Sequence, residues 1–375
     1  MPRICRRSAL VGFAGTAGIA ALSRMPGTHT VSAQGSAYDI VSFGPISEGV
    51  IPADGSRTRY GTVFNILGGG TAVGSVPASA EKMYPSLFHP DGSLTKLKSG
   101  TFGGIVLDMN DNGTAVGGVA ENAGGVRTES DEGNRPAAWI DGELVRLELP
   151  EGHLFESALT GGQAGAISND GVIFGFANGY QLVWIDGIPQ ELPQLSDAGD
   201  SLFYSLITRD GTLMASRAMF DDSGSYLGSE YGSVDGATFT PFATSGLSGI
   251  NTYIHSANSA GEVLIYSFPT DLTISNIVGV GQDPIVIDTR HDGIEFMPAG
   301  FNASHEVAGM MYLRPDLEGE PAIWKDGEVT SLSPLLPADH GYRQLVLSGI
   351  SDDGVVAASG WDDDGAFHPL LFVPA

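Results

Sequence analysis

The chain has 375 residues, of which 18 are basic and 44 acidic, and a formal net charge of −26. Binding to nucleic acid phosphates depends on Lys and Arg, so this balance argues against nucleic acid as a partner. The 53 glycines, about twice the usual share, come with no long amphipathic helical pattern and favour many short strands joined by turns.

Residues 1–33 have the features of a cleavable export signal. Arg6 and Arg7 precede an apolar, glycine-interrupted stretch from Ser8 to Leu22, and Val31-Ser-Ala33 fits a cleavage site. The paired arginines resemble a twin-arginine signal, with a general secretory signal as the alternative. We therefore expect a protein that is secreted, periplasmic or at the cell surface, with no membrane span in the mature chain, because the apolar stretch is too short for one.

Cleavage would change what can stabilise the mature chain. It would remove Cys5, the single cysteine, so that no disulfide could form. It would also remove four of the 18 basic residues and no acid, which leaves 14 against 44 and a net charge of −30. We interpret the acidic surface as a device for solubility, with cation binding as the alternative. Residues 34–375 are expected to form one monomeric domain, since no linker interrupts them.

A short unit recurs along this domain with a mean period of about 47 residues, within the range of propeller blades. In each unit an apolar run meets a turn rich in Gly, Asp or Asn and then resumes as a second apolar run. The residues that occupy the equivalent position of this turn, called the turn residues below, are Gly70, Gly113, Gly171, Gly211, Gly261, His305 and Gly354.

The second unit shows the repeat most clearly. A strand over 104–109 and the turn 110–113 lead into a second strand over 114–117. After a polar gap, strands over 136–140 and 143–149 flank Asp141-Gly142, a strong hairpin signal. Each unit therefore predicts a four-stranded antiparallel meander.

The two ends of the domain complement each other. The last unit stops at Pro369-Leu-Leu-Phe-Val373 without its fourth strand, and Tyr38-Asp-Ile-Val-Ser-Phe43 resembles a fourth strand. Joining them would avoid two exposed sheet edges. The sequence thus predicts an all-β fold, a seven-bladed β-propeller of four-stranded antiparallel blades closed by its N-terminal strand. The degenerate fourth and fifth units leave six to eight blades open.

Trp139, Trp184 and Trp324 occupy one repeat position, with Phe88 and Phe372 as equivalents. A ring of sugar-stacking aromatics is one interpretation. We favour packing between blades, because aromatic side chains commonly fill such cores.

The units resemble those of bacterial secreted proteins with the HAF repeat, in which an Ile-Asn-x-x-Gly turn precedes a Trp-x-x-Gly hairpin. The matching segments are Asp108-Met-Asn-Asp-Asn-Gly113, Ala166-Ile-Ser-Asn-Asp-Gly171, Gly349-Ile-Ser-Asp-Asp-Gly354 and the Trp-x-Asp-Gly hairpins. Pro-Ala-Ala and Pro-Ala-Ile replace the His-Ala-Phe triplet. The resemblance implies a propeller and export, and it implies no reaction.

The connection between the second and third strands varies in every unit, whereas the other two turns are tight. These connections, 75–84, 118–135, 176–180, 216–229, 266–283, 310–320 and 359–368, would share one face of the ring, the variable-loop face. Binding residues concentrate on such loops, although tolerance of insertions explains their lengths equally well. The candidate ligand-binding residues on this face are Tyr84, Arg127, Tyr226, Phe268, Tyr312, Arg314 and Trp361.

No cofactor is evident, and calcium remains open. Asp221-Asp222 and the weak candidates Asp362, Asp363 and Asp364 could supply oxygen ligands, but without the spacing of an EF-hand loop. Motifs of nucleophilic, zinc or P-loop catalysis are absent from the sequence. Three histidines, His153, His255 and His340, remain candidate acid–base residues.

These observations favour an exported, non-catalytic propeller that binds an extracellular protein or polysaccharide through its variable-loop face. The alternative is an extracellular hydrolase or lyase with a carboxylate and a histidine near the ring axis, an analogy from fold alone. A purely structural role at the cell surface is a third interpretation.

Overall fold

The structure is a computed structural model that describes residues 29–31, 36–44, 62–79, 82–101, 103–120, 134–151, 162–195, 200–247, 252–267, 274–288, 290–291, 294–312, 319–363 and 366–375. Within these ranges the chain forms strands and turns, with a single 3₁₀ segment over Ser333–Leu335 and no α-helix. No helix of the described part has the length and apolar character that a membrane span requires.

The strands form seven antiparallel sheets, one for each predicted blade. Blade 1 contains β3 (Thr62–Ile66), β4 (Ala72–Ser79), β5 (Lys82–Phe88) and β6 (Leu94–Lys96). Blade 2 contains β7 (Gly104–Met109), β8 (Ala115–Ala120), β9 (Asn134–Ile140) and β10 (Glu143–Arg146). Blade 3 contains β11 (Gly162–Ile167), β12 (Ile173–Ala177), β13 (Tyr180–Ile185) and β14 (Ile188–Glu191). Blade 4 contains β15 (Leu202–Ile207), β16 (Leu213–Phe220), β17 (Tyr226–Asp235) and β18 (Thr238–Pro241).

The remaining blades include two supplementary strands. Blade 5 contains β19 (Thr252–Ala257), β20 (Val263–Ser267), β21 (Ile274–Val278) and β22 (Ile285–Asp288). Blade 6 contains β24 (Ile294–Phe301), β25 (Val307–Tyr312), β26 (Glu320–Lys325) and β27 (Glu328–Ser331), with the short β23 (Arg290–His291) beside β24. Blade 7 contains β28 (Tyr342–Ile350), β29 (Val356–Asp362), β30 (Phe367–Pro374) and β2 (Tyr38–Ser42), with β1 (His29–Val31) outside β2.

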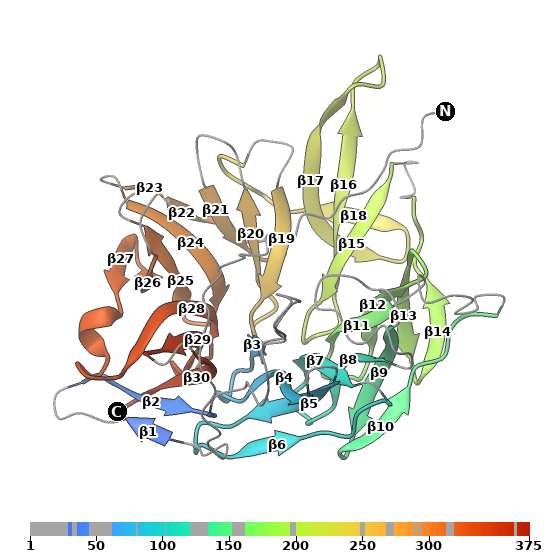
Figure 1. The fold of residues 1–375 in the computed structure, drawn as a ribbon. Helices are drawn as coiled ribbons and strands as arrows, with labels where there is room; N and C mark the ends of the chain where they lie inside the picture. Colours follow the sequence, from blue (N-terminus) through green and yellow to red (C-terminus); the bar gives the residue numbers. More distant parts are fainter. Residues whose placement is uncertain are drawn as a thin grey trace, which may run out of the picture.

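The first strand of every blade lies innermost in the ring (Figure 1). These strands contact one another in cyclic order, from β3 through β7, β11, β15, β19, β24 and β28 back to β3. The prediction of a seven-bladed β-propeller is therefore confirmed.

All seven predicted turn residues have a left-handed backbone, with φ between 58° and 88°. Glycine adopts this conformation without strain, which explains its recurrence. His305 is the one turn residue that is not glycine, and its φ is 58°. Its Nε2 lies 2.9 Å from Oε2 of Glu262 in the neighbouring blade, a contact that a glycine could not make.

The residue three positions before the turn residue fixes this turn. In six blades its side-chain oxygen accepts the N–H of the residue that follows the turn residue, at 2.9–3.1 Å. In three blades its amide also donates to the next blade: Asn110 to the carbonyl of Ser168, Asn258 to that of Asn302, and Asn302 to that of Ser351. The Asn-x-x-Gly motif is thus a structural connection between blades at the face where these turns lie, called the turn face below.

Every first strand also carries a one-residue β-bulge, six positions before the turn residue. The residue just before the bulge is buried in all seven blades, whereas the bulge residue keeps some exposure in every blade. The bulge therefore sets which side chains of the innermost strands reach solvent. The bulge residues are Phe64, Leu107, Gly165, Ser205, His255, Ala299 and Ser348.

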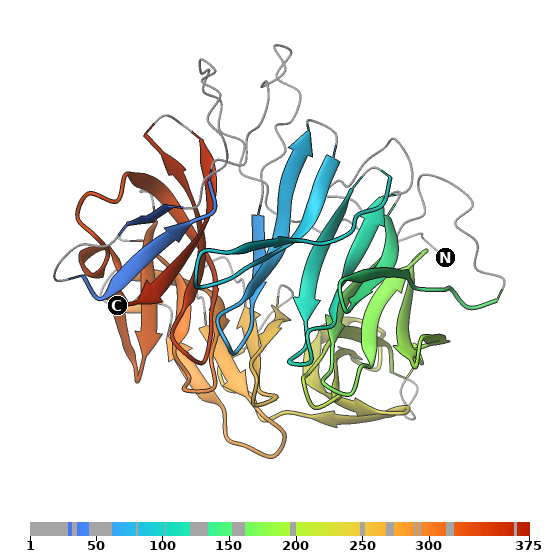
Figure 2. The same cartoon turned by 90° about the horizontal axis from the view of Figure 1, so that it is seen from below.

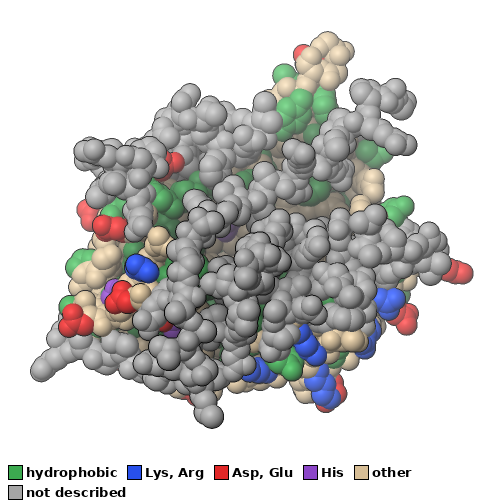
Figure 3. Space-filling view, in the orientation of Figure 1, with side chains coloured by type: hydrophobic (Ala, Val, Ile, Leu, Met, Phe, Trp, Pro, Cys, Tyr) green, Lys and Arg blue, Asp and Glu red, His purple; other side chains and the backbone are tan. Residues whose placement is uncertain are grey.

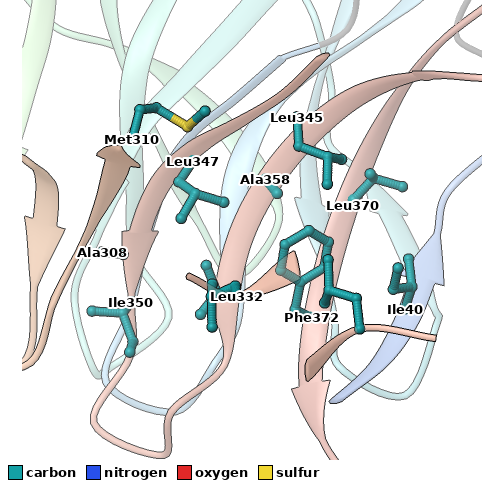
Figure 4. Close-up of a cluster of buried hydrophobic side chains, with 12 residues drawn as sticks. Ile40, Ala308, Met310, Leu332, Leu345, Leu347, Ile350, Ala358, Leu370 and Phe372 are labelled. Atoms are coloured by element: carbon teal, nitrogen blue, oxygen red, sulfur yellow. The ribbon is translucent and has the colours of Figure 1, made fainter. Parts of the chain in front are cut away.

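The N-terminal strand completes the C-terminal blade, as predicted. β2 pairs antiparallel with β30, with Ile40 opposite Phe372, and the two strands lie side by side in Figure 2. Ile40 is buried with Leu370 and Phe372 in the core of this blade (Figure 4), which extends to Ala308 and Leu332 of blade 6. Ring closure therefore combines backbone hydrogen bonds with burial of apolar surface.

The repeated tryptophans pack between blades, as favoured from the sequence. Trp139, Trp184 and Trp324 are at most 4% exposed. The indole N–H of Trp139 donates to the carbonyl of Lys98, and that of Trp184 to the carbonyl of Glu148, each at 2.6 Å. Each bond ties a blade to the end of the preceding one.

Two sequence interpretations need correction. The connection expected over 266–283 contains the third strand of blade 5, because Ile274–Val278 pairs between β20 and β22. The expected loop 216–229 is mostly strand, because β16 and β17 continue to a turn over 221–225. Irregular apolar spacing in these two units concealed the strands.

The position of β1 and β2 allows a test of the predicted processing site. A chain that begins at Gln34 loses only the outer strand β1, so its urea unfolding midpoint should match that of the full chain. A chain that begins at Gly44 also loses the burial of Ile40 and Val41, at about 1.5–3 kcal/mol for each side chain. It should unfold at a clearly lower urea concentration, and an unchanged midpoint would contradict closure by β2.

Candidate functional site

Two exposed aromatic side chains lie on neighbouring innermost strands. Phe203 on β15 and Tyr253 on β19 are 54% and 44% exposed, and each precedes its turn residue by eight positions. Since β15 and β19 are in contact, the two positions are adjacent in the ring. His255, the bulge residue of β19, is also exposed. We call Phe203, Tyr253 and His255 the central patch.

The central patch is supported by Tyr266 of β20, which lies opposite Tyr253 in the strand pair. The ring of Tyr253 contacts that of Tyr266 edge to face at 5.9 Å and lies 6.2 Å from the imidazole of His255. Tyr266 is only 2% exposed, and burial, with smaller effects of Tyr253, Glu295 and Tyr312, raises the pKa of its phenol. Although His255 reaches solvent, the surrounding protein desolvates its imidazole and lowers its pKa. The patch is therefore preformed and uncharged at neutral pH.

A polar hollow of about 30 Å³ lies at the turn face of the ring, among residues of several blades that include Asn65, Asp111, Arg209, Ser259 and Asp352. Its carboxylates already have partners. Asp352 accepts Ser259 Oγ at 2.6 Å and the N–H of Ala303 at 2.8 Å, and Asp111 accepts Asn169 Nδ2 at 2.7 Å. This network connects blades. The hollow beside it has room for about one water molecule.

Beside this hollow, a buried ion pair joins blades 2 and 4. Arg209 donates to both carboxylate oxygens of Asp108, at 2.6 and 2.7 Å, and to the carbonyl of Ile167 at 2.7 Å. Asp108 also accepts Asn65 Nδ2 and the N–H of Ile167. Burial alone would lower the pKa of Arg209, but hydrogen bonding and attraction to Asp108 outweigh burial and raise it. Four consecutive blades thus meet at one carboxylate.

The hairpin of β16 and β17 projects from the ring on the variable-loop face (Figure 1). Phe220, Tyr226 and Leu227 are 54%, 40% and 65% exposed at its end, where Figure 3 shows hydrophobic side chains along the projecting segment. The rings of Phe220 and Tyr226 meet edge to face at 5.8 Å. Asp221 fixes the turn by accepting the N–H groups of Ser223 and Ser225. We call these three apolar residues the hairpin tip.

A Ser–His–Asp arrangement lies where the ring closes. Ser42 Oγ is 3.1 Å from Nδ1 of His368, whose Nε2 is 2.9 Å from Asp362 Oδ2. Tyr342 packs edge to face on His368 at 5.3 Å. Ser42 is fully buried, so a substrate could not reach its hydroxyl. The arrangement connects β2 to β29 and β30 and therefore supports closure.

The structure separates the predicted ligand-binding residues. Tyr226 belongs to the exposed hairpin tip. Tyr84 is half-buried, with the Lys82 and Lys96 ammonium groups 5.3 and 5.6 Å from its ring centroid. Tyr312 and Trp361 are half-buried, Tyr312 against the blade 7 core and Trp361 edge to face on Phe367. Arg127, Phe268 and Arg314 lie outside the described residues.

The acidic candidates for calcium are not brought together. Among the described residues, no group of three His, Cys, Asp or Glu side chains is arranged to hold a metal ion. Asp362 bonds His368 and the N–H of Ala366, Asp363 is exposed, and Asp364 lies outside the described ranges. Asp221 bonds its own turn. Calcium stays a prediction.

The sequence interpretation missed Phe203 and Tyr253. A signal was present, since both precede the turn residue by eight positions. Their exposure could not be read from it, because the equivalent Ile105 of blade 2 is buried. His255 was a candidate, but the bulge that exposes it leaves no mark in the sequence.

Comparison with known proteins finds distant structural likenesses only. No protein-family model and no curated protein matches this chain. Among solved structures, puromycin hydrolase is 15% identical with a TM-score of 0.42, over 83% of this chain and 51% of that one, so the chain spans about half its length. The dihydro-heme d1 dehydrogenase NirN is 13% identical with a TM-score of 0.44, over 93% and 74%. TolB from Acinetobacter baumannii is 13% identical with a TM-score of 0.38, over 84% and 79%.

The ion pair of Asp108 and Arg209 should dominate stability at the turn face. In Arg209→Met a buried carboxylate loses its cation, which costs about 3–5 kcal/mol. Adding Asp108→Asn should recover a large part of that loss, because no charge then remains buried. Urea unfolding measures the free energy of unfolding of both variants. A loss below about 1 kcal/mol in Arg209→Met would mean that the pair is solvated.

The desolvated histidines predict a loss of stability on mild acidification. Burial lowers the pKa of His255 and of His340 below the ordinary 6.5, against a smaller upward effect of Asp363 on His340. The unfolded chain therefore takes up these protons at higher pH than the folded chain. The stability that the two neutral imidazoles contribute to the folded chain is fully present above pH 6.5. It decreases as the pH falls below that value.

Urea unfolding between pH 7.5 and about 5 measures this effect, in a range where most carboxylates stay ionised. His255→Gln should lose less stability across the range than the unchanged chain. Equal losses would show that the imidazole of His255 is as well solvated in the folded protein as in the unfolded one.

Proposed function

We propose that this chain is an exported, non-catalytic propeller that binds an extracellular protein through its variable-loop face, with the hairpin tip as the main contact. The observation that carries this proposal is the exposure of Phe220, Tyr226 and Leu227 together on a projecting hairpin. Grouped aromatic and aliphatic side chains at a rigid surface are typical of protein contacts. A monomer presents this tip to a different protein rather than to a second copy.

The chemistry of the tip indicates what its partner offers. Three apolar side chains fit an apolar pocket, and Asp221 and Asp222 beside them fit a basic rim. The net charge of −26 would also steer a basic partner towards this protein. Export rests on the twin-arginine-like segment 1–33 and on the resemblance to HAF-repeat proteins.

The geometry favours binding over the hydrolase or lyase alternative. That alternative calls for a histidine and a carboxylate in contact near the axis. Among the described residues His255 has no hydrogen-bonded carboxylate. The pair of His305 and Glu262 belongs to adjacent turns, and that of His368 and Asp362 to the closure blade. Each of these two pairs has a structural role.

A triple substitution tests the hairpin tip. Phe220→Ser, Tyr226→Ser and Leu227→Ser together should abolish recovery of the partner from the concentrated extracellular and periplasmic fractions, because the apolar contact is removed. The matched control replaces Ile188 and Val280 by Ser, two side chains that are exposed on other blades. It should recover the partner in full.

Circular dichroism and size-exclusion chromatography should be the same for all three proteins. Equal recovery by the triple variant and the unchanged chain would contradict the proposal. A dimer of the unchanged chain that the triple variant loses would also contradict it, since the partner would then be a second copy.

A further inference from the structure

The central patch places two exposed aromatic side chains at one repeat position of two adjacent innermost strands. Both precede their turn residue by eight positions, and they are 54% and 44% exposed. Equivalent positions hold smaller or better buried side chains, such as Thr62, Ile105 and Gln163. Exposing two large aromatic rings gives up the stabilisation that their burial would supply, so packing of the blades does not explain them.

Neighbouring rings hold Tyr253 in place before any ligand arrives. Tyr266, buried beneath, contacts the ring of Tyr253 edge to face at 5.9 Å. The bulge at His255 fixes the direction of the imidazole, 6.2 Å from the Tyr253 ring. A preformed aromatic surface loses little side-chain entropy on binding, which favours even a small ligand.

Among the residues that the structure describes, small side chains stand beside the patch. At the level of His255 the bulge residues of the other nearby blades are small: Gly165, Ser205, Ala299 and Ser348. A Cβ atom added to Gly165 would meet no heavy atom of the described residues within 4 Å. A ring-shaped ligand could therefore approach the aromatic faces without displacing side chains of these four positions.

The polar groups at the patch select the ligand class. The Tyr253 hydroxyl and the imidazole of His255 can both donate and accept hydrogen bonds without carrying a charge. The net charge of −26 disfavours an anion. No carboxylate bonds His255 among the described residues, so the patch offers an organic cation no direct counter-ion. An uncharged sugar fits this set, because its C–H face stacks on aromatic rings and its edge carries hydroxyls.

We infer that Phe203, Tyr253 and His255 form a subsite for the face of an uncharged sugar ring, separate from the hairpin tip. Phe203 and Tyr253 supply the stacking surface, and His255 with the Tyr253 hydroxyl bonds the sugar hydroxyls. Because the site lies on the innermost strands and the hairpin tip on a projecting one, the two can bind at the same time.

The test measures binding of purified oligosaccharides by isothermal titration calorimetry. The uncharged probes are maltohexaose, cellohexaose and mannohexaose. The charged probes are hexagalacturonic acid and tetramethylammonium. At least one uncharged hexamer should bind. Tyr253→Ala and Phe203→Ala should each weaken its binding about tenfold, while Tyr253→Phe, which keeps the ring, should stay within about threefold.

Two controls separate this inference from folding and from the proposed function. Tyr180→Ala removes an exposed tyrosine of another blade and should leave sugar binding unchanged, with unaltered circular dichroism in every variant. The triple hairpin variant should keep sugar binding while it loses the protein partner. Failure of all uncharged hexamers to bind, binding of a charged probe alone, or unchanged affinity in Tyr253→Ala would overturn the sugar subsite and leave the role of the hairpin tip standing.

Discussion

The antiparallel pairing of β2 with β30 is the constraint on which the rest of the structure depends. Without it the C-terminal blade lacks its outer strand, and the ring has a free edge at each end. Ile40 then leaves the core that also contains Phe372 and the apolar residues of blade 6. The buried contact of Ser42 with His368 acts at the same junction. The position of every blade, and of the side chains near the axis, follows from a ring that is closed here.

Within the closed ring the two faces differ in kind. At the turn face, side chains such as Asn110, Asn258 and Asn302 bond their own turn and the next blade, and Asp108 with Arg209 joins blades that are not neighbours. These polar side chains of the turn face are used in hydrogen bonds and ion pairs that hold the blades together. On the variable-loop face, apolar side chains stand exposed on the β16–β17 hairpin instead. The contrast explains why the repeated motif carries stability while recognition is assigned to residues outside it.

The sequence predicts seven blades, with six to eight left open, and it predicts the ring closure and the turn positions, because each depends on a local rule. A left-handed backbone selects glycine, and this holds at six of the seven turn residues. The third strand of blade 5 was not predicted, since Ile274–Val278 lacks the Trp-x-Asp-Gly signature that the third strands of blades 2, 3 and 6 carry. The central patch was not predicted for another reason. The exposure of Phe203 and Tyr253 depends on bulges and on neighbouring blades, which no local sequence pattern encodes. Tyr226 was identified because it lies in a variable connection, and the structure exposes it at the hairpin tip.

Native-state amide hydrogen exchange tests the central claim of ring closure most directly. If β2 is an integral strand of blade 7, the amides of Ile40 and Val41 should exchange with the same opening free energy as those of β30, within about 1 kcal/mol. Fast exchange across Tyr38–Ser42 beside a protected β30 would contradict closure, and with it the placement of both proposed binding surfaces on one rigid ring.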